Sequence, residues 1–216
     1  MDRPQPVTSE LERDLANIRS FNRWFGSYRQ VRHYLSRWLK PNGKARILDV
    51  ATGSGDIPRL IVDFARRHNV SVRIDAIDQQ SSTIEIARRL SADYREIDFF
   101  SANLFEWNPS ERYDIVHCSL ALHHFSDDDA VRVLRKCREL SCSRVLIGDL
   151  RRSRWLSVGV YLLTAAIYRN AMTKTDARLS AARAFSFDEM HELAERADWR
   201  NFGHRKFPIG RQAIWL

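Results

Sequence analysis

The sequence contains little cysteine and no long apolar run. Its three cysteines, Cys118, Cys137 and Cys142, are an odd number without paired spacing, which argues against a disulfide framework and a four-ligand zinc site. The longest charge-free apolar stretch, residues 155–168, would measure about 21 Å as a helix, less than the roughly 30 Å hydrocarbon core of a bilayer. The N-terminal sequence also lacks the apolar segment of a signal peptide. We therefore expect a cytoplasmic protein without a membrane span.

Acidic residues are absent from one long stretch of an otherwise mixed sequence. Residues 15–46 contain eight Lys or Arg and no Asp or Glu, and residues 151–183 contain seven basic residues against Asp176 alone. The whole chain carries a net charge of +8, so its remainder is net acidic. Because the positive charge is confined to two segments that flank an acidic body, the composition does not favour nucleic acid as the partner.

Hydrophobic residues make up 44% of the chain and aromatic residues 11%, which is enough for a folded core. Short apolar strands alternate with longer helical patterns along most of the sequence. This alternation predicts an α/β fold, with a doubly wound, mostly parallel, seven-stranded Rossmann-like sheet preceded by N-terminal helices. The predicted strands are residues 46–50, 72–77, 97–100, 113–118, 144–147, 201–207 and 212–216, and the helical patterns are residues 10–39, 56–67, 82–90, 127–140, 155–168 and 187–197.

A glycine-containing turn follows the first predicted strand, in the sequence Asp49-Val50-Ala51-Thr52-Gly53-Ser54-Gly55-Asp56. Glycines let the backbone approach a ligand closely, and the next helix presents its free N–H groups there. A dinucleotide-binding turn has the pattern Gly-x-Gly-x-x-Gly, whose third glycine allows close packing of helix and strand. Counting from Gly53, Pro58 occupies that third position, which argues against NAD.

Four segments in order resemble the motifs of class I S-adenosylmethionine-dependent methyltransferases. LDVATGSGD resembles motif I, with Ala51 where the family usually has its first glycine. IDAIDQQS, Ala102-Asn103-Leu104 and YDIVHCSLALHHF resemble the motifs that follow the next three strands. Residues 44–150 match well and residues 184–216 loosely, and LDVATGSGDI is most similar to enzymes of ubiquinone and menaquinone biosynthesis and to relatives that act on phenols or polyketides.

The resemblance implies S-adenosyl-L-methionine as the cofactor. Asp78 would accept hydrogen bonds from both ribose hydroxyls, since one carboxylate can take two O–H donors. Asn103 would read the adenine amino group, Leu104 would flank the ring, and the methyl end would lie near Cys118 and Ser119. The expected cofactor-binding residues are Asp49, Ala51, Thr52, Gly53, Gly55, Asp78, Gln79, Asn103, Leu104, Cys118 and Ser119.

Candidate catalytic residues follow the fourth and fifth strands. His123 and His124 lie at the sheet edge where open α/β folds bind ligands, and a histidine there can serve as general base for a phenol or hydroquinone. The resemblance favours His124, and the alternative is that one or both histidines only hydrogen-bond the cofactor loop or cap the packing. Asp149 would orient the substrate or act as a base, or it would instead pair with Arg151 or Arg152.

A metal site is the other interpretation of the histidine pair with Asp127, Asp128 and Asp129. Ser126 or Asp127 at the cap of the next helix, with acids in its first turn, explains the same residues without a metal. We therefore expect no metal.

The resemblance divides the chain into an N-terminal helical lid over residues 1–43 and a methyltransferase domain over residues 44–216. A helical lid insertion after the fifth strand would span residues 151–183. Three roles are open for its apolar helix. It would line a pocket for a lipophilic acceptor, rest on an anionic bilayer through residues 151–172, or pack on the domain with its arginines solvated.

The predicted activity is methyl transfer to an oxygen, or alternatively a carbon, of a lipophilic phenolic, quinol or polyketide-like small molecule. One rival is a nucleic-acid (RNA) methyltransferase. Enzymes that modify an exocyclic base nitrogen have Asn/Asp/Ser-Pro-Pro-Tyr after the fourth strand, whereas this chain has Ser119-Leu120-Ala121-Leu122. The other rival is a non-catalytic cofactor-binding protein, which the glycine turn and Asp78 disfavour.

Overall fold

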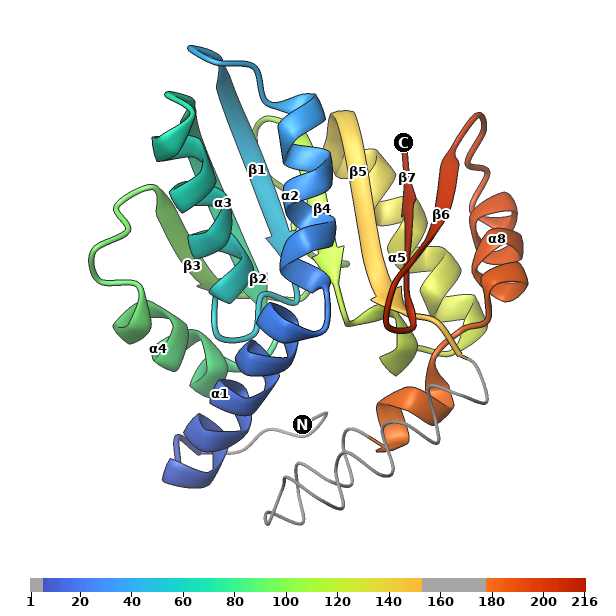
Figure 1. Ribbon diagram of the computed structural model, residues 1–216, viewed down its shortest axis with the longest axis horizontal. Helices are drawn as coiled ribbons and strands as arrows, with labels where there is room; N and C mark the ends of the chain where they lie inside the picture. Colours follow the sequence, from blue (N-terminus) through green and yellow to red (C-terminus); the bar gives the residue numbers. More distant parts are fainter. Residues whose placement is uncertain (1–5, 153–177) are drawn as a thin grey trace.

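A seven-stranded sheet with the strand order β3-β2-β1-β4-β5-β7-β6 forms the centre of the protein (Figure 1). The computed structural model describes residues 6–152 and 178–216. The strands are β1 Lys44–Val50, β2 Ser71–Asp78, β3 Ile97–Ser101, β4 Tyr113–Ser119, β5 Ser141–Leu150, β6 Gly203–Phe207 and β7 Arg211–Trp215. The first five pair in parallel and β7 pairs antiparallel with both β5 and β6. The predicted α/β fold is confirmed.

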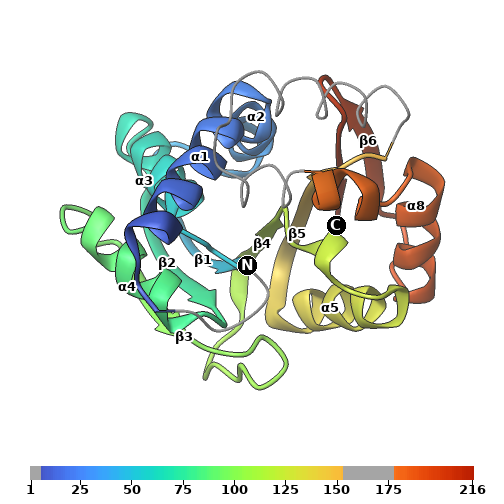
Figure 2. The same ribbon diagram turned by 90° about the horizontal axis from the view of Figure 1, so that it is seen from below.

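Helices cover both faces of this sheet (Figure 2). Apolar side chains of α2, α3 and α4 pack with β1, β2 and β3 in one cluster, whereas α5 and α8 pack with β4 and β5 in another. The helices are α1 Ser9–Trp24, α2 Ser27–Trp38, α3 Asp56–Arg67, α4 Ser81–Leu90, α5 Asp127–Leu140 and α8 Phe187–Arg196, with a 3-10 turn, η1, at Leu122–His124. Because the central strands are covered on both faces, they are apolar along nearly their whole length.

The sequence pattern suggested one continuous helix across residues 10–39, but the structure has two helices there. Helix α1 ends at Trp24, and α2 begins at Ser27 after Gly26, whose φ of 97° is left-handed. Glycine adopts this conformation without the steric cost of a Cβ. The apolar spacing continues through the break, so periodicity alone did not reveal it. The break lets α1 turn away from the sheet face towards the carboxyl ends of the strands (Figure 1).

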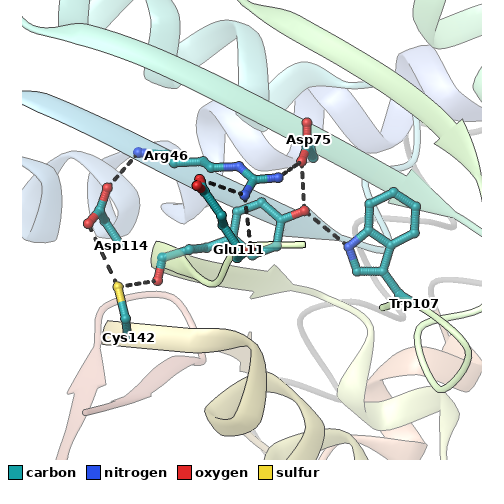
Figure 3. A network of polar contacts seen from close by, with 7 residues as sticks. Arg46, Asp75, Trp107, Glu111, Asp114 and Cys142 are labelled. Atoms are coloured by element: carbon teal, nitrogen blue, oxygen red, sulfur yellow. Dashed lines mark hydrogen bonds and ion pairs between the residues drawn. The ribbon is translucent and has the colours of Figure 1, made fainter. Parts of the chain in front are cut away.

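A network of polar contacts links neighbouring strands of the sheet (Figure 3). The Tyr113 hydroxyl donates a hydrogen bond to Asp75 Oδ2 at 2.6 Å, and Arg46 Nη2 donates to the same oxygen at 3.0 Å. Trp107 Nε1 donates to the Tyr113 hydroxyl at 3.1 Å. The contacts among Arg46, Asp75 and Tyr113 join β1, β2 and β4. Because Trp107 lies in the segment after β3, its hydrogen bond also holds the loop that contains Asn103 and Leu104.

No helix within residues 6–152 and 178–216 is both long and apolar enough to cross a bilayer. The predicted helix at residues 155–168 lies outside the described residues. The same holds for most of the lid insertion at residues 151–183 and of the membrane contact at residues 151–172.

Candidate active site

A cavity of about 490 Å³ lies at the carboxyl ends of the parallel strands. It is bordered by the segments that follow β1, β2, β3 and β4, by the end of β5, and by α1, towards which the strands point (Figure 1). The predicted cofactor-binding residues that line it are Asp49, Ala51, Thr52, Gly53, Asp78, Gln79, Asn103, Leu104, Cys118 and Ser119. The fold therefore brings residues from four separate sequence motifs to one site.

The turn after β1 has the backbone conformation that its composition suggested. Ala51, Gly53 and Gly55 all have positive φ, at 54°, 55° and 71°. A Cβ added to Gly53 would meet no atom within 4 Å, so the backbone there faces open space. Gly55 differs, because it does not line the cavity and an added Cβ would lie 2.8 Å from the Phe99 ring. The packing of the start of α3 against β3 accounts for a glycine at this position, and the predicted contact of Gly55 with the cofactor stays a prediction.

Asp78 ends β2 and is tied to this turn through its carboxylate. Its Oδ2 accepts a hydrogen bond from the Gly53 N–H at 2.9 Å, and its Oδ1 accepts one from the Gln80 N–H at 2.9 Å. Burial raises the pKa of Asp78, although these two hydrogen bonds act in the opposite direction. Each carboxylate oxygen has a second lone pair, so the group can accept two further O–H donors.

The loop after β3 holds its own polar side chain in place. Asn103 Oδ1 accepts a hydrogen bond from the Phe105 N–H at 3.0 Å, and Asn103 Nδ2 donates to Glu106 Oε1 at 3.3 Å. Leu104 is buried beside it.

At the end of β4, Cys118 is fully buried, which raises the pKa of its thiol and keeps it protonated. Ser119 follows it at the cavity wall.

Two buried carboxylates that the sequence analysis did not single out also line the cavity. Asp14 comes from α1, and Asp56 is the first residue of α3. Asn22 Nδ2 of α1 donates a hydrogen bond to Asp56 Oδ2 at 3.0 Å, and burial raises the pKa of this carboxyl group. Together with Asp49 and Asp78, they make the part of the cavity beside the glycine-containing turn acidic. Asp14 and Asp56 lie 42 positions apart, so no local motif in the sequence joins them.

Asp49 is itself paired within the sheet. Its Oδ1 lies 2.6 Å from His117 Nδ1 of the neighbouring strand β4, and both side chains are buried. His117 falls within the fourth-strand motif, but the pairing depends on the register of β1 against β4.

A second buried histidine and aspartate pair lies beyond β4. Asp149, 1% exposed, accepts hydrogen bonds from the His123 backbone N–H at 3.0 Å and from the Leu150 N–H at 2.7 Å. His123 Nδ1 lies 2.7 Å from Asp149 Oδ1. Burial raises the pKa of Asp149, but the imidazole and the hydrogen bonds outweigh it and hold that pKa below its ordinary value.

Of the two alternatives for Asp149, the pairing with Arg151 or Arg152 is not found among the described residues, because its carboxylate is held by His123 and Leu150. Arg152 instead forms an ion pair with Glu189. Asp149 does not line the cavity either, whereas His123 does. Asp149 is thus separated from the cavity by the His123 imidazole, whose orientation it fixes.

The two adjacent histidines lie in different environments. His123 is 4% exposed, and its Nε2 has no hydrogen-bond partner among the described residues. His124 is exposed, lines the same cavity, and has its ring centroid 4.3 Å from that of His123. The sequence favoured His124, whereas the structure shows the Asp149 carboxylate beside Nδ1 of His123, where it fixes the tautomer of that ring.

The acidic run after these histidines begins a helix. Ser126 is the N-cap of α5, with its Oγ accepting a hydrogen bond from the Asp129 N–H at 3.3 Å, as the capping interpretation predicted. Asp129 also pairs with Arg132, and Asp128 with Arg196. In the part of the chain that the structure describes, no group of three or more His, Cys, Asp or Glu side chains is placed to hold a metal ion.

Comparisons with known proteins agree with this geometry. The family model described as "Methyltransferase domain" matches residues 47–141. A demethylmenaquinone methyltransferase of Thermotoga maritima is 33% identical over 95 residues, which are 44% of this chain and 38% of that protein. An N-terminal Xaa-Pro-Lys N-methyltransferase 1 of Danio rerio is 27% identical over 117 residues, 52% of this chain and 50% of that protein. The chain thus spans half or less of the length of these curated relatives.

Similarity of fold extends over more of the chain. The structure of the plantazolicin methyltransferase BpumL in complex with S-adenosylhomocysteine (SAH) superposes with a TM-score of 0.69 at 12% identity, covering 95% of this chain and 88% of that one. At this identity the superposition establishes the fold alone. Together, the domain match and the fold confirm the resemblance found in the sequence motifs.

Proposed function

We propose that this chain, which contains a class I methyltransferase domain with its family match over residues 47–141, is an active S-adenosylmethionine-dependent methyltransferase. Its acceptor is a lipophilic phenolic, quinol or polyketide-like small molecule, methylated on an oxygen or a carbon. The observation that carries the proposal is one cavity lined both by the motif residues and by His123. The relation to a demethylmenaquinone methyltransferase supports the acceptor class.

The residues present fit this cofactor. Asp78 has free lone pairs for the two ribose hydroxyls, and the open backbone at Gly53 leaves room beside them. Thr52 Oγ1 is buried at the cavity wall without a hydrogen-bond partner among the described residues. The carboxylates of Asp49 and Asp56 make this half of the cavity suitable for a ligand that carries positive charge.

When bound, the cofactor supplies an activated methyl group on a positively charged sulfur, so the protein must align the acceptor, exclude water and remove a proton. His123 is the proton acceptor in this proposal. Because ionised Asp149 holds the proton on Nδ1, the lone pair of the neutral imidazole is on Nε2. The acceptor hydroxyl passes its proton to Nε2 as its oxygen takes the methyl group, and Asp149 stabilises the resulting imidazolium.

Isotope transfer tests the activity itself. We expect that incubation with methyl-labelled S-adenosylmethionine and a host extract yields a labelled lipophilic small molecule, detected by mass spectrometry. A protein in which His123 is replaced by asparagine provides the matched control. Label found only in nucleic acid, or label in no product at all while SAH binds, would contradict the proposed activity.

Cofactor affinity tests the role of Asp78. We expect Asp78→Ala to weaken SAH binding by about 1–3 kcal/mol, the range for hydrogen bonds to a charged group. The matched control is Asp98→Ala, which removes an exposed carboxylate from the neighbouring strand β3. Because burial raises the pKa of Asp78, wild-type affinity should fall as the pH drops through that raised pKa, and Asp78→Ala should lose this dependence. Equal affinities of wild type and Asp78→Ala would contradict the assignment.

A further inference from the structure

A buried arginine lines the end of the cavity that lies away from the glycine turn. Arg211 begins β7, which pairs with β5 on the side of β5 opposite to β4, and its register partner is Leu150. Arg211 is only 3% exposed, and both Arg211 and Leu150 line the cavity. Sequence analysis did not single out Arg211, because it lies 61 positions after Leu150 in the chain.

The guanidinium of Arg211 lacks a carboxylate partner among the described residues. Its Nε donates a hydrogen bond to the Phe25 backbone oxygen at 3.1 Å, and its Nη1 is buried without any partner. Asp149 is the acid that interacts with it electrostatically, but the oxygens of Asp149 already accept hydrogen bonds from His123 and Leu150. Burial lowers the pKa of Arg211 to about 10, so the group is still charged at neutral pH.

A buried charge with so few partners is costly to the folded protein. Burying a cation requires compensation by hydrogen bonds or an opposite charge. The carbonyl of Phe25, at the C-terminus of α1, offsets part of this cost, because helix C-termini carry partial negative charge. The remaining donors of a planar guanidinium suit the two oxygens of a carboxylate.

The distribution of charge around the cavity separates two regions. Asp14, Asp49, Asp56 and Asp78 lie on α1, the glycine turn and the end of β2, where the proposed cofactor would sit. The cationic lining residues, Arg183 and Arg211, come from segments beyond β5, on the side of His123 and Asp149. This is the region left for the acceptor.

We infer that the acceptor carries a carboxylate, which Arg211 binds while His123 faces the hydroxyl to be methylated. The inference rests on the proposed function and narrows its acceptor class to hydroxylated aromatic or related acids. The carboxylate would fix the orientation of the acceptor in the cavity, so Arg211 serves as a specificity-determining residue.

Paired probes test this inference. SAH-saturated protein is titrated with a set of hydroxybenzoates, each matched by the corresponding hydroxybenzamide, and binding is followed by ligand-observed NMR. We expect wild type to bind the carboxylates about tenfold to a hundredfold more tightly than the amides, the range for charge-assisted hydrogen bonds. Arg211→Gln should abolish that preference, and Arg211→Lys should keep part of it. Arg205→Gln, on the neighbouring strand β6 and exposed, is the matched control and should keep it fully.

Equal binding of carboxylates and amides by wild type would overturn the inference, and so would an unchanged preference in Arg211→Gln. If Arg211→Gln does not fold, the carboxylate preference of Arg211→Lys is compared with that of wild type, because lysine keeps the charge and loses the planar fork. We expect the preference to be reduced in Arg211→Lys, and an unchanged preference would overturn the inference. SAH binding is measured first for each protein. Failure of wild type to bind SAH contradicts the proposed function, whereas SAH binding without a carboxylate preference contradicts only the role of Arg211.

Discussion

Replacing His123 with asparagine is expected to lower the turnover of methyl transfer by about 10²- to 10⁴-fold, the range for losing a general base. The reason is geometric: His123 lines the cavity, and the carboxylate of Asp149 fixes its tautomer. The measurement is the initial rate with labelled cofactor and the acceptor identified by mass spectrometry. SAH affinity should change little, since the effect is on proton transfer.

The neighbouring histidine supplies the control. His124→Asn should reduce turnover much less than His123→Asn, because His124 is exposed whereas His123 is buried and held by Asp149. A large loss of turnover in His124→Asn, together with near-normal turnover in His123→Asn, would favour His124 as the base and contradict the assignment of His123.

Removal of the Asp149 carboxylate is expected to have the largest effect on stability. Asp149→Ala should lower the free energy of unfolding by about 3–5 kcal/mol, because it leaves the buried partners of a charged group without their acceptor. Those partners are the His123 imidazole and the backbone N–H groups of His123 and Leu150. Urea unfolding measures the difference. Asp128→Ala is the matched control and should change stability little, since the side chain of Asp128 is 88% exposed.

The stability conferred by Asp149 should depend on pH with a defined sign. Its pKa is lowered in the folded protein, so its contribution is fully present above the unfolded value of about 3.9 and is lost as the pH falls through the folded value. The difference between wild type and Asp149→Ala should therefore be constant near neutral pH and shrink in acid. A difference of the same size at both ends of this range would contradict the ionised state of Asp149.

The parallel sheet could be predicted because each central strand is buried on both faces and appears in the sequence as a short apolar run. Helices α3 and α5 begin and end at the residues expected, since Gly55 and Ser126 mark their starts. The division of the N-terminal helices at Gly26 was missed, because apolar spacing continues through the break.

The meeting of the motif residues at one cavity could be predicted because they occupy fixed intervals after consecutive strands. The side of the cavity that His123 and Arg211 line could not, because it depends on contacts between distant segments. Asp149 and His123 are joined by the placement of η1 beside β5, and Arg211 enters the cavity only through the antiparallel pairing of β7 with β5. Glycine serves equally at a ligand and at a tight packing contact, so the sequence alone did not show that Gly55 lies against the Phe99 ring.

We propose that the cavity at the carboxyl edge of the sheet binds S-adenosylmethionine. Calorimetric titration of the wild-type protein with SAH, and in parallel with NAD, measures this binding. We expect one SAH site per chain, because Asp78 is placed for the ribose hydroxyls, and no heat of binding with NAD, because Pro58 replaces the third glycine of a dinucleotide turn. Absence of SAH binding, or binding of NAD in its place, would contradict it.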